Sequence, residues 1–181
     1  MRIFVLTGAG VSAESGLGTF RDADGVWTRF DLTKVATPEG FAEDPARVHG
    51  FYNLRRRNLL KARPNAAHAA LARLQQGLAG RGDGLFFCTQ NVDDLHEKGG
   101  AAEVVHMHGE LSKLRCESCG WIDLWFEDCF PDTPCPRCAR PGGLRPDVVW
   151  FGETPHALDA IYEAVSAADL FVDRKSTRLN S

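Results

Sequence analysis

The chain begins with an apolar segment, Ile3-Phe-Val-Leu-Thr7, that leads directly into a glycine-rich turn. Gly8, Gly10 and Ala13 occupy the small positions of the nucleotide-binding pattern Gly-x-Gly-x-x-Gly/Ala. Glycines at these positions let backbone N–H groups come close to a phosphate. An ordinary tight turn after a buried strand produces the same pattern, so the turn alone leaves both interpretations open.

Two features next to this turn sharpen its interpretation. A helix predicted to start at residues 12–16 would direct its partially positive N-terminus at a bound phosphate. A dehydrogenase would have a second strand ending in an acidic ribose ligand about 20 residues further on. Here the chain reads Trp27-Thr-Arg-Phe-Asp-Leu-Thr33 instead. The turn therefore indicates a nucleotide phosphate, but not a standard dehydrogenase.

Composition restricts the class of protein. With 181 residues, 44% of them hydrophobic and 25% charged, the chain is expected to fold as one globular domain, or as one domain with a small insert. A net charge of −3 gives no basic surface for nucleic acid. There is no apolar run of 18 residues and no signal-peptide cleavage pattern, so we expect a cytoplasmic protein with no membrane partner.

Apolar runs of strand length alternate with segments of helical periodicity. This alternation predicts an α/β fold, namely a Rossmann-like parallel sheet. Proline and glycine around residues 38–45 indicate a loop-rich stretch. The predicted strands are 3–7, 85–89, 104–108, 148–151 and 169–172, and the predicted helices are 46–62, 66–78, with Asn65 as its N-cap, and 158–167.

Four cysteines form two C-x-x-C pairs, Cys116/Cys119 and Cys135/Cys138. Two such pairs supply the four thiolates of a closed, tetrahedral, structural Zn²⁺ site, and Gly120 permits the tight turn after the first pair. A redox pair is the alternative. Residues 115–141 are rich in Cys, Pro and Asp, and we expect them to form a small inserted zinc-ribbon module. Cys88 and Cys129 lie outside the pattern and are interpreted as packing residues.

Polar residues follow two of the predicted strands. Thr89-Gln-Asn-Val-Asp93 supplies amides and a carboxylate at a strand end, where α/β folds bind ligands. A simple polar turn is the alternative. His106 and His108 share one face of a strand. Their spacing suits a metal pair, a general base beside Gly109, or structural histidines, and it does not decide among them.

Taken together, five motifs resemble the sirtuins, which are NAD-dependent protein-lysine deacylases. The resemblance covers residues 1–172 and is best to the bacterial CobB-type branch, class III. One departure is Leu17-Gly18, where many sirtuins have Ile-Pro. The motifs are Gly8-Ala-Gly-Val-Ser-Ala-Glu-Ser-Gly16 with Phe20-Arg21, Thr89–Asp93, His108-Gly109, the four cysteines, and Val149-Trp-Phe-Gly-Glu153.

The resemblance implies a role for each motif. NAD⁺ would be the co-substrate, and acyl-lysine proteins or peptides the substrate. His108 would be the general base that acts on the ribose once nicotinamide has left, and the products would be free lysine, nicotinamide and 2′-O-acyl-ADP-ribose. Val149, Phe151 and Gly152 would bind substrate. The implied NAD⁺-binding residues are Gly8, Ala9, Gly10, Ser12, Ala13, Phe20, Arg21, Trp27, Gln90, Asn91 and Asp93.

Tyr52 and Arg55 lie three residues apart on a predicted helix and so share one face. In the class III branch this Tyr-x-x-Arg pair contacts the terminal carboxylate of succinyl- or malonyl-lysine. The resemblance therefore implies desuccinylase or demalonylase activity besides deacetylation. A solvated basic face is the alternative, because Arg56 and Arg57 follow directly. ADP-ribosyl transfer and a non-enzymatic zinc-stabilised fold are the competing functions.

The last nine residues, 173–181, form a polar, cationic run that matches the conceptual translation of a sequencing adapter. We expect this run to be non-native, with a natural disordered tail as the alternative. Residues 1–114 and 142–172 would then form an NAD-binding domain without its usual C-terminal part, because the family normally continues with further strands. We therefore expect the 181-residue chain by itself to bind NAD poorly and to turn over little.

Overall fold

The computed structural model describes residues 1–17 and 30–174. Its larger sheet has four parallel strands in the order β3-β2-β1-β7. The register places Thr7 beside Thr89, so the polar segments that follow β1 and β2 leave the same edge of the sheet. The predicted parallel α/β sheet is confirmed. Its strands are β1 (Arg2–Thr7), β2 (Gly84–Thr89), β3 (Val105–His106) and β7 (Leu170–Arg174).

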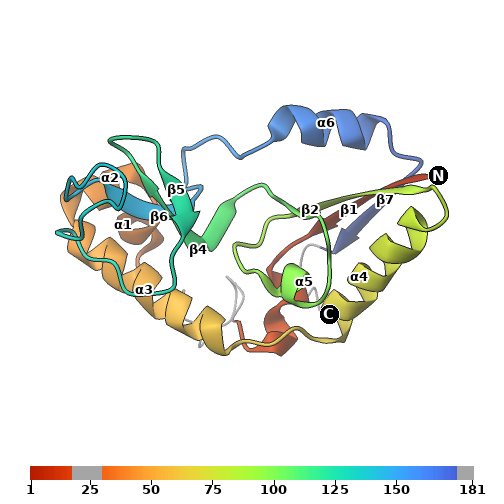
Figure 1. Cartoon of the computed structure of the whole chain (residues 1–181), viewed down its shortest axis with the longest axis horizontal. Coiled ribbons are helices and arrows are strands. Elements are labelled where there is room, and N and C mark those ends of the chain that lie inside the picture. The colour runs from red at the N-terminus through yellow and green to blue at the C-terminus, as the bar shows by residue number, and fades with distance from the viewer. Residues whose placement is uncertain (18–29, 175–181) are drawn as a thin grey trace.

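Helices cover both faces of this sheet (Figure 1). Alternate residues of β1 point to opposite faces. Ile3 and Val5 pack in a core with residues of α4 (Ala66–Ala79), whereas Phe4 packs with Ile161 of α6 (Leu158–Ser166). The short α5 (Leu95–Lys98) lies on the α4 side.

A second lobe is built on a three-stranded antiparallel sheet in the order β5-β4-β6 (Figure 1). The helices before residue 62 pack against this sheet, in a core that includes Val48, Phe51, Leu111 and Trp150. The elements of this lobe are α1 (Leu32–Val35), α2 (Pro38–Glu43), α3 (Pro45–Lys61), β4 (Gly109–Cys116), β5 (Ile122–Leu124) and β6 (Leu144–Val148).

The predicted positions of α3 and α4 are correct to within one residue. Asn65 caps α4 as expected, because its side chain accepts a hydrogen bond from the backbone N–H of Ala67. The prediction that a helix starts at residues 12–16 is wrong. Two 3₁₀ turns, Ala9–Val11 and Ala13–Ser15, occupy this region, and Gly16 ends them in the left-handed conformation at φ +82°.

The stretch around residues 38–45 is helical rather than loop-rich. Pro38 and Pro45 each stand in the first turn of a helix, where a missing N–H costs nothing. The side chains of Thr37 and Asp44 cap these helices. Gly40 is needed because a Cβ there would lie 2.6 Å from the carbonyl oxygen of Lys34.

Strand β4 was not predicted, and the strand predicted over 148–151 is displaced to 144–148. A register shift between Glu110 and Leu114 interrupts the alternation of β4. Strand β7 runs two residues further than predicted, so Asp173 and Arg174 pair with β1. Among the described residues, no helix is long and apolar enough to cross a membrane.

Candidate functional site

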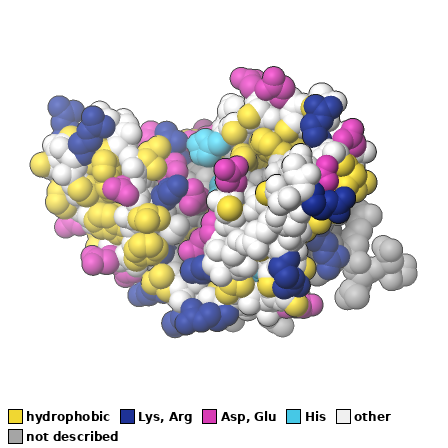
Figure 2. Space-filling model, turned by 45° about the vertical axis from the view of Figure 1, so that its right-hand side comes forward, with side chains coloured by type: hydrophobic (Ala, Val, Ile, Leu, Met, Phe, Trp, Pro, Cys, Tyr) yellow, Lys and Arg dark blue, Asp and Glu magenta, His cyan; other side chains and the backbone are white. Residues whose placement is uncertain are grey.

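Backbone hydrogen bonds join the predicted motifs, and Figure 2 shows that the surface is hollowed between the two lobes. The backbone N–H of Gln90 donates to the carbonyl oxygen of Thr7 at 2.9 Å, which joins the glycine turn to the Thr89–Asp93 segment. The N–H of Val149 donates to the carbonyl oxygen of His108 at 2.9 Å. These two bonds join four motifs that are distant in the sequence into two pairs.

Ser12 is the hub of the site's polar contacts. Its hydroxyl, which is 2% exposed, donates to Asp93 Oδ2 at 3.0 Å and accepts from Asn91 Nδ2 at 3.1 Å. Burial raises the pKa of the Asp93 carboxyl, and hydrogen bonds from Leu95 N–H and Ser12 oppose the rise. The structure thus brings Ser12, Asn91 and Asp93 together. Gly8, Ala9, Gly10 and Ala13 lie in the turns that follow β1, next to Ser12 in the sequence.

Two buried histidines support this hub, and the sequence analysis did not select them. His68 Nδ1 accepts the N–H of Asn65 in a capping box, and its ring lies 4.8 Å from the His96 ring. His96 Nε2 lies 2.9 Å from Thr7 Oγ1. Burial, with His68 close by, lowers the pKa of His96 to about 4, so the ring is neutral near pH 7. The Asn65-x-x-His68 spacing was the available signal for His68, whereas His96 had none.

His108 is half-buried, and its Nδ1 lies 3.0 Å from the carbonyl oxygen of Gln90. A carbonyl oxygen only accepts, so Nδ1 carries the proton and Nε2 of the neutral ring keeps its lone pair. Burial lowers the pKa of His108, although the hydrogen bond to Gln90 by itself would raise it. Gly109 follows at φ +77°, where a Cβ would lie 2.1 Å from the carbonyl oxygen of Asp147, so only glycine fits there.

His106 has a different environment from His108. Its Nδ1 lies 3.1 Å from the carbonyl oxygen of Asn91, and its Nε2 lies 2.7 Å from Glu97 Oε1. Burial alone would lower the pKa of His106, but Glu97 outweighs it and the pKa rises. Because the two histidines bond to separate partners, the geometry does not favour a metal pair. In the described part of the chain, only the four cysteines cluster as metal ligands.

Tyr52 and Arg55 lie together on α3, with the Arg55 guanidinium 5.7 Å from the Tyr52 ring centroid. Burial lowers the pKa of Arg55, and the charges of Tyr52 and Asp93 oppose this. Arg55 thus lies beside the phenol, and the Asp93 carboxylate is near enough to affect its pKa. The alternative of a solvated basic face is wrong for Arg56, which is 1% exposed.

The remaining predicted residues fall into two groups. Val149 is half-buried, and Phe151 is exposed while its N–H donates to the carbonyl oxygen of Ala36 at 3.0 Å. Gly152 is exposed beside Phe151, at φ +90°. Phe20, Arg21 and Trp27, which were predicted to bind NAD, lie outside the described residues.

The four cysteines converge at one end of the second lobe. Cys116 Sγ lies 3.8 Å from Cys138 Sγ, and Cys119 Sγ lies 3.8 Å from Cys135 Sγ. Corners of a tetrahedron with Zn–S bonds of about 2.3 Å lie roughly 3.8 Å apart, so both of these separations match those of a zinc-bound set. All four thiols lie within 4.8 Å of one another. This is a structural zinc site, because four thiolates leave no open coordination position.

Comparison with known proteins agrees with this geometry. The model of the Sir2 family matches residues 8–174. A Caulobacter vibrioides protein named NAD-dependent protein deacylase is 66% identical over 174 residues, which are 95% of this chain and 72% of the relative. The Escherichia coli K12 protein of the same name is 53% identical over 173 residues, 94% of this chain and 61% of the relative.

Solved structures show the same fold with ligands bound. A Sir2 homologue crystallised with NAD has a TM-score of 0.83 and 40% identity, and the match covers 98% of this chain and 69% of that one. A Sir2 homologue with ADP-ribose reaches a TM-score of 0.85 at 40% identity, over 97% and 70% of the two chains. A glycine turn with its polar hub, a half-buried histidine beside Gly109 and a cysteine tetrad thus occur in one fold, and the chain belongs to the Sir2 family, the sirtuins.

Proposed function

We propose that this chain carries the catalytic core of an NAD-dependent protein-lysine deacylase that removes acetyl groups and prefers acyl groups ending in a carboxylate. The curated relatives support the deacylase activity by name, and the chain spans 61–72% of the two relatives described above. The preference for succinyl or malonyl groups rests on Tyr52 and Arg55. We propose acyl-lysine proteins or peptides as substrates.

The nucleotide would lie on the turns after β1 and against the Gln90–Asp93 segment. When bound, NAD⁺ supplies the ADP-ribose acceptor for the acyl group and nicotinamide as the leaving group. The backbone of Gly8, Ala9 and Gly10 offers close approach for a pyrophosphate. Asn91 and Asp93, held by Ser12, present amide and carboxylate groups for ribose and carboxamide. Because hydrogen bonds within the protein already hold these side chains, they lose little conformational freedom when the nucleotide binds.

His108 would act as the base. Its Nδ1–H is committed to Gln90, so the lone pair of Nε2 accepts the proton of a sugar hydroxyl. Its lowered pKa keeps the ring neutral near pH 7. This fixed tautomer is the observation that carries the proposed catalytic role, since a histidine with the opposite tautomer would present an N–H instead of a base.

Tyr52 and Arg55 would bind the acyl carboxylate. A guanidinium gives a bidentate, charge-assisted contact, and a phenol adds one hydrogen bond. Their proximity supports this assignment, because a guanidinium beside a phenol offers an acyl carboxylate both a positive charge and a hydrogen-bond donor. An acetyl group would therefore bind with less affinity than a succinyl group.

A mass-spectrometric assay of matched acetyl- and succinyl-lysine peptides with NAD tests the proposal. It should use the product of the gene re-sequenced past codon 172, which also tests whether residues 173–181 are native. We expect succinyl-lysine to be preferred, and the preference to disappear in Tyr52→Phe and Arg55→Met. An unchanged preference in these variants would overturn the pocket assignment, and the absence of NAD-dependent turnover would overturn the deacylase itself.

A further inference from the structure

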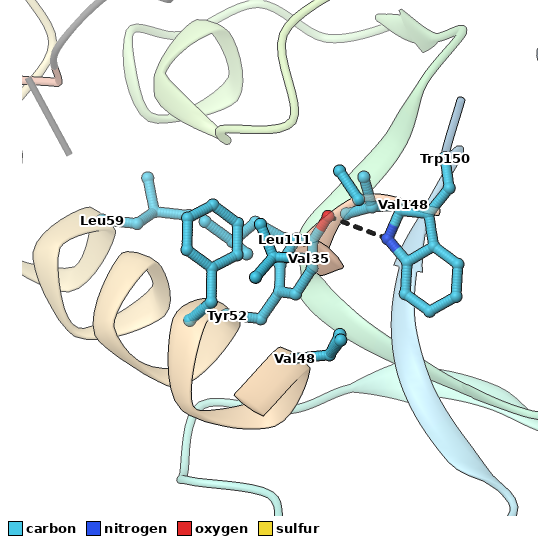
Figure 3. Close-up of a cluster of buried hydrophobic side chains, with 9 residues drawn as sticks. Val35, Val48, Tyr52, Leu59, Leu111, Val148 and Trp150 are labelled. Carbon is cyan, nitrogen blue, oxygen red and sulfur yellow. Dashed lines mark hydrogen bonds between the residues drawn. The ribbon is translucent and has the colours of Figure 1, made fainter. Parts of the chain in front are cut away.

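Tyr52 is joined to a residue that none of the predicted roles uses. The indole Nε1–H of Trp150 donates to the Tyr52 hydroxyl oxygen at 2.8 Å, as the dashed line in Figure 3 shows. Both side chains are at most 2% exposed. The two residues are 98 positions apart and come from α3 and from the loop that follows β6. This buried bond therefore ties the acyl-selecting helix to the substrate-side loop.

The hydrogen bond fixes what the phenol can do. A tyrosine hydroxyl has one proton to donate, and Trp150 Nε1 can only donate. Tyr52 must therefore accept from Trp150 and direct its own proton elsewhere. None of the residues in 1–17 and 30–174 accepts that proton through a hydrogen bond. The phenol is thus left as a donor for an acceptor that enters the pocket.

Arg145 and Glu153 hold Trp150 from two sides, and we call these two residues the Trp150 brace. The Arg145 guanidinium stacks on the indole at 3.4 Å from the ring centroid. Both of its terminal nitrogens donate to the Glu153 carboxylate, at 2.7 and 2.9 Å. Glu153 Oε2 also accepts the backbone N–H of Trp150 at 2.8 Å. The brace leaves the indole little freedom to turn away from Tyr52.

We infer that Trp150 is a positioning residue for acyl selection, which orients the Tyr52 hydroxyl as a donor toward the carboxylate of the acyl group. The inference rests on the proposed function. An acetyl group has no terminal acceptor, so the orientation favours dicarboxylic acyl groups only. Arg55 supplies the positive charge, and Trp150 orients the hydrogen bond that Tyr52 donates to the acyl carboxylate.

The test is a double-mutant cycle with Trp150→Phe, Tyr52→Phe and the double variant. Phenylalanine keeps a ring for Arg145 to stack on and removes the N–H. We expect Trp150→Phe to lower the ratio of succinyl to acetyl kcat/KM by about threefold to tenfold, the usual effect of one hydrogen bond. In the Tyr52→Phe background it should cause no further drop in that ratio, because the group through which it acts is gone.

Affinity for the succinyl-lysine peptide, measured by calorimetry without NAD, should fall by a similar factor in Trp150→Phe. Glu153→Gln, which weakens the brace but keeps the indole N–H, should lower the ratio less. Thermal unfolding of each variant identifies any that do not fold. Equal losses on both peptides, or effects that multiply in the double variant, would overturn the inference while Tyr52→Phe still upholds the pocket. If Tyr52→Phe leaves the ratio unchanged, the inference and the proposed acyl preference both fail.

Discussion

His108 and Gln90 form the contact on which the proposed chemistry depends. Nδ1 of His108 lies 3.0 Å from the backbone carbonyl oxygen of Gln90, at the edge where β2 delivers the Gln90–Asp93 segment. A backbone carbonyl has no proton of its own and does not change its role with pH. The contact therefore fixes both the tautomer and the orientation of the ring without a second titrating group.

The first prediction concerns His108 as base. The pKa of His108 is lowered from the ordinary histidine value near 6.5. The ring is therefore neutral at pH 7 and becomes protonated only below pH 6.5. We expect kcat/KM to fall on the acid side of pH 6.5 with a slope of one. His108→Gln should lower kcat by roughly 10²- to 10⁴-fold. Steady-state kinetics of deacylation across pH 5–8 measure both effects.

His106→Gln is the matched control, since His106 is two residues away and lies against Asn91 and Glu97 instead. Its effect on kcat should be at least tenfold smaller. If the two glutamine variants lose equal activity, His108 has no special role as base.

The second prediction separates two neighbouring arginines. Arg56 is buried and donates to the carbonyl oxygens of Leu111 and Glu127 and to Asn53 Oδ1, at 3.0–3.2 Å. Arg56→Met removes all three hydrogen bonds, although Asn53 Oδ1 keeps the N–H of Cys129 as a donor at 2.9 Å. We therefore expect the free energy of unfolding to fall by about 3 kcal/mol. Arg57, by contrast, makes an exposed ion pair with Asp128 at 3.4 Å.

Arg57→Met should change the same free energy by less than about 1 kcal/mol. Denaturant titration of both variants at pH 7 gives the comparison. Similar losses in the two variants would contradict a stabilising role for the buried hydrogen bonds of Arg56. The sequence Arg55-Arg56-Arg57 does not by itself show which of the arginines is buried.

Elements whose signal is local could be predicted from the sequence. The apolar runs of β1 and β2, and the periodicity of α3 and α4 with the Asn65 cap, each lie within one segment. The two C-x-x-C pairs also carry their chemistry locally. Strand β4 could not be found in this way, because a register shift breaks its alternation and its burial depends on α3 and β6.

The support beneath the site is non-local, and this is why it was missed. Ser12 meets His68 across 56 positions, and Thr7 meets His96 across 89. Nothing in the spacing of these residues pairs them. Trp150 is a further example, because nothing in its sequence position indicates that its indole N–H donates to Tyr52. Sequence motifs identified the residues expected to face the ligand. The residues that hold them in place could be identified only from the structure.

The third prediction concerns the two zinc knuckles, which have the same backbone. The N–H of Gly120 donates to the Cys116 carbonyl oxygen, and the N–H of Ala139 donates to that of Cys135. Both donors are left-handed, at φ +68° and +59°. A Cβ in this conformation costs about 1–2 kcal/mol. Ala139→Gly should therefore stabilise the zinc-bound protein by up to about 1 kcal/mol, and Gly120→Ala should destabilise it.

Thermal unfolding of the two variants, together with the rate of zinc release to a chelator, measures this prediction. One zinc should be released per chain, and its removal should unfold the module, because the cysteines themselves form part of its core with Leu114 and Leu144. Opposite signs for the two substitutions are the expected outcome. Destabilisation by both would mean that Ala139 makes contacts worth more than the strain.

The last prediction concerns acid stability and rests on two buried histidines. Burial lowers the pKa of His49 and of His96 to about 4. Unfolded histidines bind protons near pH 6.5, so between pH 6.5 and pH 4 the unfolded state takes up protons that the folded state refuses. The contribution of these histidines to the free energy of unfolding falls as the pH drops through this window, by on the order of 3 kcal/mol for each residue, and changes little below pH 4.

His49 is the residue to vary, because its ring lies edge-on to Phe41 at 5.5 Å, away from the nucleotide turn. His49→Phe should reduce the loss of stability between pH 6.5 and pH 4.5 without removing it, since the contribution of His96 remains. Urea titrations at these two pH values measure the change. Carboxylates titrate in both proteins and cancel in the difference, so an identical pH dependence in the variant would show that His49 is protonated in the folded state.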